Sequence, residues 1–182
     1  MTARRDVDYA EYVSASLPSL RRLALLLCHD WQRADDLVQA AVIRLFVRWG
    51  KAAAADNLDA YVRAILFREF LHEQRSGWAS RVRLTNVPPE VPAAAADEDA
   101  ALDLQTAVAA LPPRQRAALV LRFYCDLNVD QSAQVLGCSP GTVKSQTARA
   151  LSTLRRALGR ESEPGQLNAG AAQDNRTRGG GS

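Results

Sequence analysis

The chain has 182 residues, of which 47% are hydrophobic and 24% charged, and its formal net charge is only +3. That length suits one medium domain or two small ones, and no apolar run reaches the roughly 18 residues that a membrane span needs. Its three cysteines are widely spaced without a CxxC pair, and only two histidines accompany them. We therefore expect buried or half-buried thiols and no metal or cofactor. Because the first residues lack a signal-peptide core, we expect a cytoplasmic protein without membrane contacts.

Charge is distributed unevenly along the chain. Residues 1–78 carry 11 basic against 10 acidic side chains, and residues 79–103 carry two against five. Residues 104–158 carry seven basic against two acidic side chains, and residues 159–182 carry three of each. The third segment, with a net charge of +5, suits a phosphate-bearing partner, whereas the acidic second segment repels one.

Apolar residues recur at helical spacing through the first part of the chain. Residues 7–28 form one stripe, in which Pro18 is expected to kink or split the helix. Residues 33–49 form a second stripe, which Phe46 widens, and residues 57–75 form a third. Helices with facing apolar stripes predict a compact helical bundle.

The next segment is expected to be a linker. Its core, VPPEVPAAAADEDA, is acidic, rich in Pro and Ala, and poor in large apolar side chains. Such composition is typical of a flexible connection. Its roughly 25 residues reach about 80 Å when extended, so the domains on either side need not touch. The tail at 159–182 is low in apolar residues and is expected to be disordered.

The stretch from Asp130 to Ala150 predicts a helix-turn-helix. Its first half has apolar residues at the spacing of a short helix that lies on a core. Gly137 then suits a tight turn with positive φ. Ser139 can cap a second helix that has Pro140 at its first position and Val143 as its buried anchor. The other side chains of that second helix are mostly polar or cationic, as a DNA major groove requires: Lys144, Ser145, Gln146, Ala148 and Arg149. The alternative is a surface hairpin with a solvated cationic face.

Further helices are expected to support this hairpin. Helix resumes at Leu102, is broken by the Leu111-Pro112-Pro113 run and forms again from Ala117 to Tyr124. The predicted fold is therefore all-α, with two small helical domains at residues 1–78 and 104–158 joined by the flexible acidic linker.

Two stretches in fixed order resemble bacterial sigma factors. RADDLVQAAVIRLFVRW looks like the helix with which they bind the polymerase clamp. LPPRQRAALVLRFYCDLNVDQSAQVLGCSPGTVKSQTARAL looks like their helix-turn-helix domain. The two-domain layout resembles the extracytoplasmic-function (ECF) group of the sigma-70 family, and the phrase AYVRAILF suggests its actinobacterial branch. The resemblance covers about residues 8–158.

The resemblance implies a promoter-specificity subunit rather than an enzyme. It would direct RNA polymerase core, through the clamp of the β′ subunit and the β flap, to promoter DNA and help to melt that DNA. An anti-sigma protein is a further candidate partner. The acidic linker residues Asp97, Glu98, Asp99 and Asp103 would mimic nucleic-acid charge in the polymerase cleft.

The resemblance also implies three sets of site residues. The set for polymerase core is Asp36, Gln39, Ala40 and Arg44, where the family usually has Glu in place of Ala40. The set for single-stranded −10 DNA is Lys51, Asn57, Tyr61, Arg63, Arg68, His72 and Arg75. The set for −35 duplex DNA is Arg122, Ser139, Thr142, Lys144, Ser145, Gln146, Ala148 and Arg149. The guanidinium groups of Arg114, Arg116 and Arg122 are expected at phosphates. Tyr61 and Phe67 are candidate stacking rings, although core positions are favoured for Trp49, Tyr61, Phe67 and Phe70.

Two other classes of protein are alternatives to a sigma factor. A stand-alone helix-turn-helix regulator would have an N-terminal ligand or dimerisation domain, which has no need for the polar strip RADDLVQ. A hydrolase or transferase would need a Gly-rich phosphate loop, a metal cluster or a nucleophile–base pair, and the sequence offers none of these convincingly.

Overall fold

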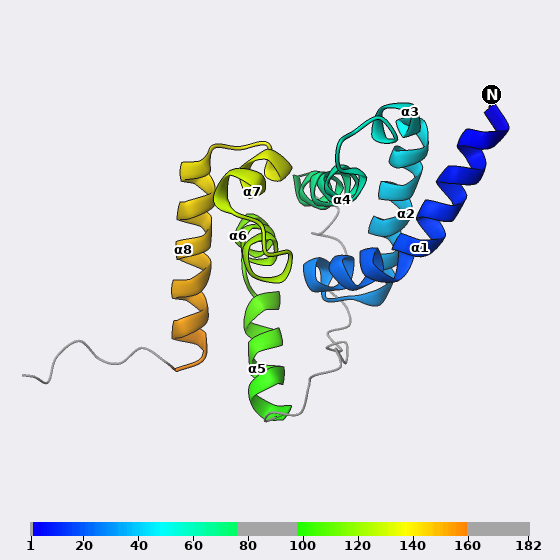
Figure 1. Cartoon of the computed structure of the whole chain (residues 1–182). Coiled ribbons are helices and arrows are strands. Elements are labelled where there is room, and N and C mark those ends of the chain that lie inside the picture. The colour runs from blue at the N-terminus through cyan, green and yellow to red at the C-terminus, as the bar shows by residue number, and fades with distance from the viewer. Residues whose placement is uncertain (1, 76–97, 160–182) are drawn as a thin grey trace, which may run out of the picture.

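The computed structural model describes residues 2–75 and 98–159, which form the two groups of helices seen in Figure 1. Within these ranges every regular element is a helix, so the predicted all-α class is confirmed. Trp78, the linker up to Asp97 and the tail from residue 160 lie outside the described residues.

The first group contains four helices: α1 (Thr2–Cys28), α2 (Trp31–Val47), α3 (Trp49–Ala52) and α4 (Leu58–Arg75). Pro18 lies inside α1 without splitting it, and Figure 1 shows that α1 changes direction along its length, as a helix with an internal proline commonly does. His29 ends α1 with a φ of 53°, and the Asp30 carboxylate caps α2 by accepting a hydrogen bond from the Arg33 backbone N–H at 2.8 Å.

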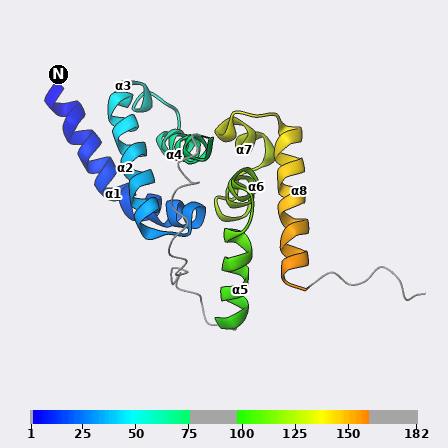
Figure 2. The same cartoon turned by 180° about the vertical axis from the view of Figure 1, so that it is seen from behind.

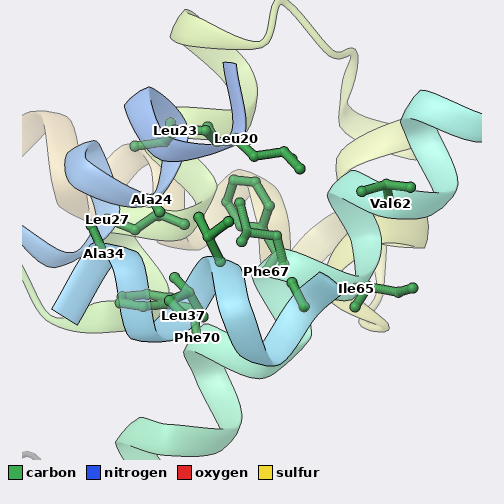
Figure 3. Packing of buried hydrophobic residues seen from close by; sticks show 14 of the residues in the cluster. Leu20, Leu23, Ala24, Leu27, Ala34, Leu37, Val62, Ile65, Phe67 and Phe70 are labelled. Atoms are coloured by element: carbon green, nitrogen blue, oxygen red, sulfur yellow. The ribbon is translucent and has the colours of Figure 1, made fainter. Parts of the chain in front are cut away.

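The core of the first group lies where α1, α2 and α4 meet. Figure 3 shows leucines of α1 and α2 around the rings of Phe67 and Phe70, both of which are completely buried. The predicted stripe of residues 33–49 is confirmed at Leu45 of α2 and at Trp49 of α3, but Phe46 is 55% exposed and Leu17 of α1 is 36% exposed. Each residue of a helix is rotated by about 100° from its neighbour, so Phe46 turns away from the core that Leu45 enters.

The second group contains α5 (Glu98–Ala109), α6 (Pro113–Leu119), the π-helical turn η2 (Val120–Tyr124), α7 (Val129–Leu136) and α8 (Pro140–Ala157). Helix α5 begins at Glu98, inside the predicted linker and before the expected start at Leu102. The Pro-Pro break is confirmed, since α6 begins with Pro113 at its first position.

The two groups are packed against each other. Helix α4 lies beside α7 in both Figure 1 and the view from behind in Figure 2, and it also contacts α6. Buried side chains of the second group, Val120 and Val135 among them, belong to the same core cluster as Phe67 of α4. The expectation that the domains need not touch is therefore corrected. The reach of a linker limits how far two domains can separate, but apolar surface on both domains favours contact.

Candidate nucleic-acid and polymerase interfaces

The first helix of the predicted helix-turn-helix is fixed at both ends. At its start the Asn128 side chain accepts a hydrogen bond from the Gln131 N–H at 2.9 Å, and the Gln131 side chain accepts one from the Asn128 N–H at 2.9 Å. At its end Gly137 has a φ of 63°, as the sequence predicts. The capping box at Asn128 was missed, although an Asn followed by Gln three residues later is its usual signature.

The second helix, α8, also starts as predicted. The Ser139 hydroxyl accepts a hydrogen bond from the Thr142 N–H at 3.2 Å and lies 2.9 Å from the Thr142 hydroxyl, while Pro140 occupies the first helical position. Val143 is completely buried, and further along α8 Ala150 and Leu154 pack in a separate cluster with residues of α5 and α6.

Burial of one side of α8 leaves another side open to solvent. We call it the α8 face and define it as Lys144, Ser145, Ala148 and Arg149, all of which are exposed. Gln146, predicted with them, is half-buried. The α8 face therefore presents two cations, a hydroxyl and a methyl group, which are groups that can contact base edges in a major groove.

Two arginines predicted at phosphates donate hydrogen bonds to backbone carbonyls. Arg122 donates a hydrogen bond to the Leu127 carbonyl and so ties η2 to the loop before α7. Arg116 donates to the carbonyls of Leu27, Ala109 and Leu111, at 2.5, 2.5 and 3.0 Å. Its guanidinium points inward in this arrangement, so the expectation of a phosphate contact at Arg116 is corrected. Arg114 is exposed.

The predicted polymerase residues lie together on α2. Asp36 and Gln39 are exposed, Ala40 is half-buried, and exposed Arg44 pairs with Glu69 of α4 at 2.6 Å. Sequence reasoning missed the apolar side chains that share this side of the helix, although their position outside the buried stripe was the available signal. Ile43 is 65%, Phe46 55% and Val47 78% exposed. We call the following set the α2 face: Asp36, Gln39, Ala40, Ile43, Phe46 and Val47.

The residues predicted for −10 DNA divide into two places. Lys51 and Tyr61 line a hollow of about 560 Å³ between the end of α2 and α4, together with Arg48, Gly50 and Val47. Arg48 was not predicted, although its position outside the apolar stripe of residues 33–49 was the available signal. Phe67 is completely buried, so it offers no ring for stacking, whereas Tyr61 is half-buried at the hollow.

The other −10 candidates follow α4 away from the hollow. Asn57 caps this helix by accepting a hydrogen bond from the Ala60 N–H at 2.9 Å. Arg68 donates to the Gln134 carbonyl of α7 at 3.3 Å, and Arg63 is close enough to Cys125 of the second group to partly offset the rise in the pKa of that thiol that burial causes. His72 and Arg75 are exposed near the end of α4.

Three buried groups near the contact between the two helical groups have shifted pKa values. Burial raises the pKa of the Cys28 thiol to about 12. Burial, followed by the charge of Arg116, lowers the pKa of His29 to about 4. Burial also lowers the pKa of Arg116 to about 10, so the guanidinium stays charged at neutral pH.

Residues 2–75 and 98–159 contain no group of three or more His, Cys, Asp or Glu side chains that could hold a metal ion. None of the helices described in these ranges combines the length and apolar character that crossing a bilayer requires.

Comparison with known proteins identifies both helical groups. The sequence matches the family description Sigma-70 region 2 over residues 12–80 and Sigma-70, region 4 over residues 101–154. It is 35% identical over 159 residues to the RNA polymerase sigma-E factor of Streptomyces avermitilis, which covers 84% of this chain and 86% of that protein. It is 30% identical over 149 residues to the ECF RNA polymerase sigma factor EcfG of Rhodopseudomonas palustris, which covers 78% of this chain and 80% of that protein.

A solved structure gives the same result. The chain resembles, with a TM-score of 0.68 and 26% identity, one from the co-crystal structure of the sigma factor RpoE with the anti-sigma factor NepR from Bartonella quintana. That match covers 85% of this chain and 98% of the other. The chain therefore belongs to the sigma-70 family, within its extracytoplasmic-function group of RNA polymerase sigma factors.

Proposed function

We propose that this sigma factor divides its work among three surfaces: the α2 face binds polymerase core, the α8 face reads −35 duplex DNA, and the hollow between α2 and α4 captures single-stranded −10 DNA. The observation that carries the proposal is the α8 face, because a capped helix with exposed cations on one side and a buried anchor on another suits a major groove. The protein binds and opens DNA, and the polymerase supplies the bond-making chemistry. It acts in the cytoplasm, where the polymerase works.

The α2 face has the composition of a docking surface. Exposed apolar side chains that lie together commonly mark protein contacts. The side chains of Ile43 and Phe46 supply apolar contact area. The Asp36 carboxylate can accept hydrogen bonds, and the Gln39 amide can accept or donate them, which would fix the orientation of the partner. The clamp of the β′ subunit is the proposed occupant of this face.

The α8 face combines specificity with anchoring. Lys144 and Arg149 can donate to O6 and N7 of guanine, and the Ala148 methyl can contact a thymine methyl. The exposed Arg114 on α6 is better suited to a phosphate, which positions the protein without specifying sequence. The Ser139 hydroxyl already caps α8 and the Thr142 hydroxyl lies 2.9 Å from it, so these groups contribute first by orienting the start of that helix.

The hollow is suited to a single unstacked nucleotide. Its volume of about 560 Å³ lies within the roughly 300–1,000 Å³ typical of small-ligand sites. Arg48 and Lys51 can attract the phosphates of the strand, and the Tyr61 ring can stack on a base. Capture of an extruded base offsets the loss of pairing and stacking, so melting needs no ATP.

A further proposed partner is an anti-sigma protein. The RpoE structure that this chain resembles contains one, namely NepR. A protein that covered the α2 face or the α8 face would keep the sigma factor away from polymerase or promoter DNA.

Run-off transcription with the purified chain, sigma-free core enzyme and genomic fragments tests the proposal directly. Specific start sites are expected, and their absence on every template would refute it. Lys144→Ala with Arg149→Ala should reduce use of the −35 sequence while binding to core is kept. Asp36→Ala with Gln39→Ala should weaken binding to core while binding of the chain alone to a −35 duplex is kept. Arg155→Ala, which removes an exposed cation near the end of α8, is the matched control. Loss of both functions in one double variant would contradict the assignment.

A further inference from the structure

The hollow proposed for −10 DNA is built from elements that depend on their neighbours for their placement. Its wall comes from the end of α2, from the four-residue helix α3 and from Tyr61 of α4. Isolated helices shorter than about 12 residues are marginal in water, so tertiary contacts have to orient α3. Gly50 and Lys51, which line the hollow, come directly after Trp49 in the chain. Contacts that fix Trp49 therefore also fix this part of the wall.

Trp49 is held by two tyrosines of α1. The Tyr9 ring meets the Trp49 ring edge-on with centroids 5.3 Å apart, and the Tyr12 ring lies tilted against it at 6.0 Å. Aromatic pairs of this kind contribute more than the area they bury and favour particular geometries. The Tyr9 hydroxyl also donates to the Val42 carbonyl of α2 at 2.8 Å. The first half of α1, which runs along α2 toward α3 in Figures 1 and 2, therefore supports the short helix.

A hydrogen bond connects the same half of α1 with the start of α4. The Tyr12 hydroxyl donates to the Asp59 carboxylate at 2.7 Å. Burial, followed by this hydrogen bond, raises the pKa of Tyr12 to about 12, so the phenol remains a donor at neutral pH. Asp59 precedes Tyr61 by two positions, which places the two side chains about 200° apart around the helix. The bond therefore holds one side of α4 while Tyr61 lines the hollow on the other side.

We propose that Tyr12 is a positioning residue for the capture of −10 DNA. Through Trp49 and Asp59 it holds α3 and the start of α4 in the arrangement that receives a base. Tyr12 is not among the residues that line the hollow, so it acts on DNA through the residues that do. The role in capture rests on the proposed function of the hollow, whereas the hold on α3 concerns the chain alone.

The size of the effect follows from the population of the receiving arrangement. If the hollow has this arrangement only part of the time, the apparent affinity for DNA falls by the same fraction. Tyr12→Phe keeps a ring beside Trp49 and removes only the donor to Asp59. The net worth of one hydrogen bond corresponds to a change of about two- to tenfold in such a population.

The first experiment measures the backbone of α3 in the chain alone. Hydrogen–deuterium exchange followed by mass spectrometry compares wild type, Tyr12→Phe and Tyr124→Phe. Tyr124 is an exposed tyrosine of η2, so its variant is the matched control for the same chemical change. Tyr12→Phe should exchange faster than the other two chains in residues 49–61, with exchange in α7 and α8 unchanged. Equal exchange in residues 49–61 would overturn the positioning role.

The second experiment measures capture with the chain assembled on sigma-free core enzyme. The probe is a labelled single-stranded −10 oligonucleotide taken from a start site mapped by run-off transcription, and binding is followed by fluorescence anisotropy. Tyr12→Phe should bind it about two- to tenfold more weakly than wild type and Tyr124→Phe. All three should bind a −35 duplex equally, whereas a purely structural role would weaken both probes or neither. Equal affinity for the −10 probe, together with faster exchange in α3, would overturn the role in capture.

Two substitutions of Asp59 separate its hydrogen bond from its charge. Asp59→Asn and Asp59→Leu have similar shapes and both remove the negative charge, but only Asn keeps an oxygen that can accept from Tyr12. Asp59→Asn should therefore bind the −10 probe more tightly than Asp59→Leu. In the Tyr12→Phe background this difference should disappear, because the donor is gone. An equal difference in both backgrounds would overturn the hydrogen bond as the positioning contact.

Failure of the proposed function would give a different result. If no template yields a start site, or if Lys51→Ala with Tyr61→Ala leaves the affinity for the −10 probe unchanged, the hollow does not capture DNA. The role of Tyr12 in capture is then overturned as well. Hydrogen–deuterium exchange of the chain alone still decides whether Tyr12 holds α3.

Discussion

Replacement of Gly137 by Ala isolates the cost of one backbone angle in the helix-turn-helix. Gly137 has a φ of 63°, and a Cβ built there would meet nothing within 4 Å, so no side-chain clash contributes. An L-residue in this left-handed region costs about 1–2 kcal/mol. Ala also stiffens the unfolded chain, which returns about 0.4–1 kcal/mol. The expected net loss in the free energy of unfolding is therefore about 1 kcal/mol.

Gly141→Ala is the matched control because it makes the same chemical change four residues away. Gly141 lies in the first turn of α8, and its added Cβ would sit 3.8 Å from the Ser139 hydroxyl oxygen, which is ordinary contact. Ala has a higher helix propensity than Gly, by up to about 1 kcal/mol. This variant should be slightly more stable than wild type, so the two glycines should give shifts of opposite sign.

Urea unfolding followed by circular dichroism measures both changes. With a slope of roughly 1–3 kcal/mol per molar urea, a loss of 1 kcal/mol lowers the midpoint by about 0.3–1 M. Gly137→Asn should recover part of the loss, since Asn tolerates positive φ better than Ala does. An unchanged midpoint for Gly137→Ala would refute the argument from backbone conformation. A loss above about 3 kcal/mol would refute the claim that the site is open.

Three further predictions concern buried and capping groups. The pKa of His29 is lowered to about 4 in the folded chain, so the unfolded chain takes up the proton first as the pH falls. The free energy of unfolding should therefore fall by about 2–3 kcal/mol between pH 6.5 and pH 4. Measured by urea unfolding, His29→Asn should lose less of its free energy of unfolding between pH 7 and pH 4.5 than wild type does. An equal loss in both would contradict the role of His29 in this pH dependence. Asn128→Ala should cost about 1 kcal/mol in the same assay at pH 7. The Cys28 thiol, whose pKa is raised to about 12, should not react with a thiol reagent at pH 8 until urea unfolds the chain. Modification of Cys28 in the folded chain, detected by mass spectrometry after labelling, would contradict this prediction.

Local rules explain why the helix-turn-helix could be predicted from the sequence. The positive φ of Gly137, the Ser139 cap and the burial of Val143 each depend on a few neighbouring residues, and all three are confirmed. Which side chains of α2 are buried depends also on the helices that pack against it. Periodicity identifies the stripe through Leu45 but not its width, and Phe46 proves to lie outside it, edge-on to the Tyr9 ring at 5.2 Å.

The contact between the domains could not be predicted in this way. A charged residue such as Arg116 is ordinarily assigned to the surface, because only tertiary partners can compensate its burial. Those partners are backbone carbonyls, which carry no sequence signature, and one of them lies 89 positions away at Leu27. Arg68 is exposed, but its partner, the Gln134 carbonyl, is likewise a backbone group without a sequence signature.

The proposed contact between the α2 face and polymerase core has Ala40 at the position where the resemblance leads us to expect a Glu. A charge-assisted hydrogen bond contributes about 1.5–3 kcal/mol, but its charges must first lose their water. Ile43 and Val47, exposed by 65% and 78%, can each contribute a similar amount on burial, about 1.5–3 kcal/mol for a complete side chain. Apolar burial is not screened by salt, whereas an ion pair at an exposed surface is. If the α2 face binds core as proposed, core binding should therefore depend on ionic strength less than binding through a Glu at this position would. Asp36 and Gln39 would then set orientation more than affinity.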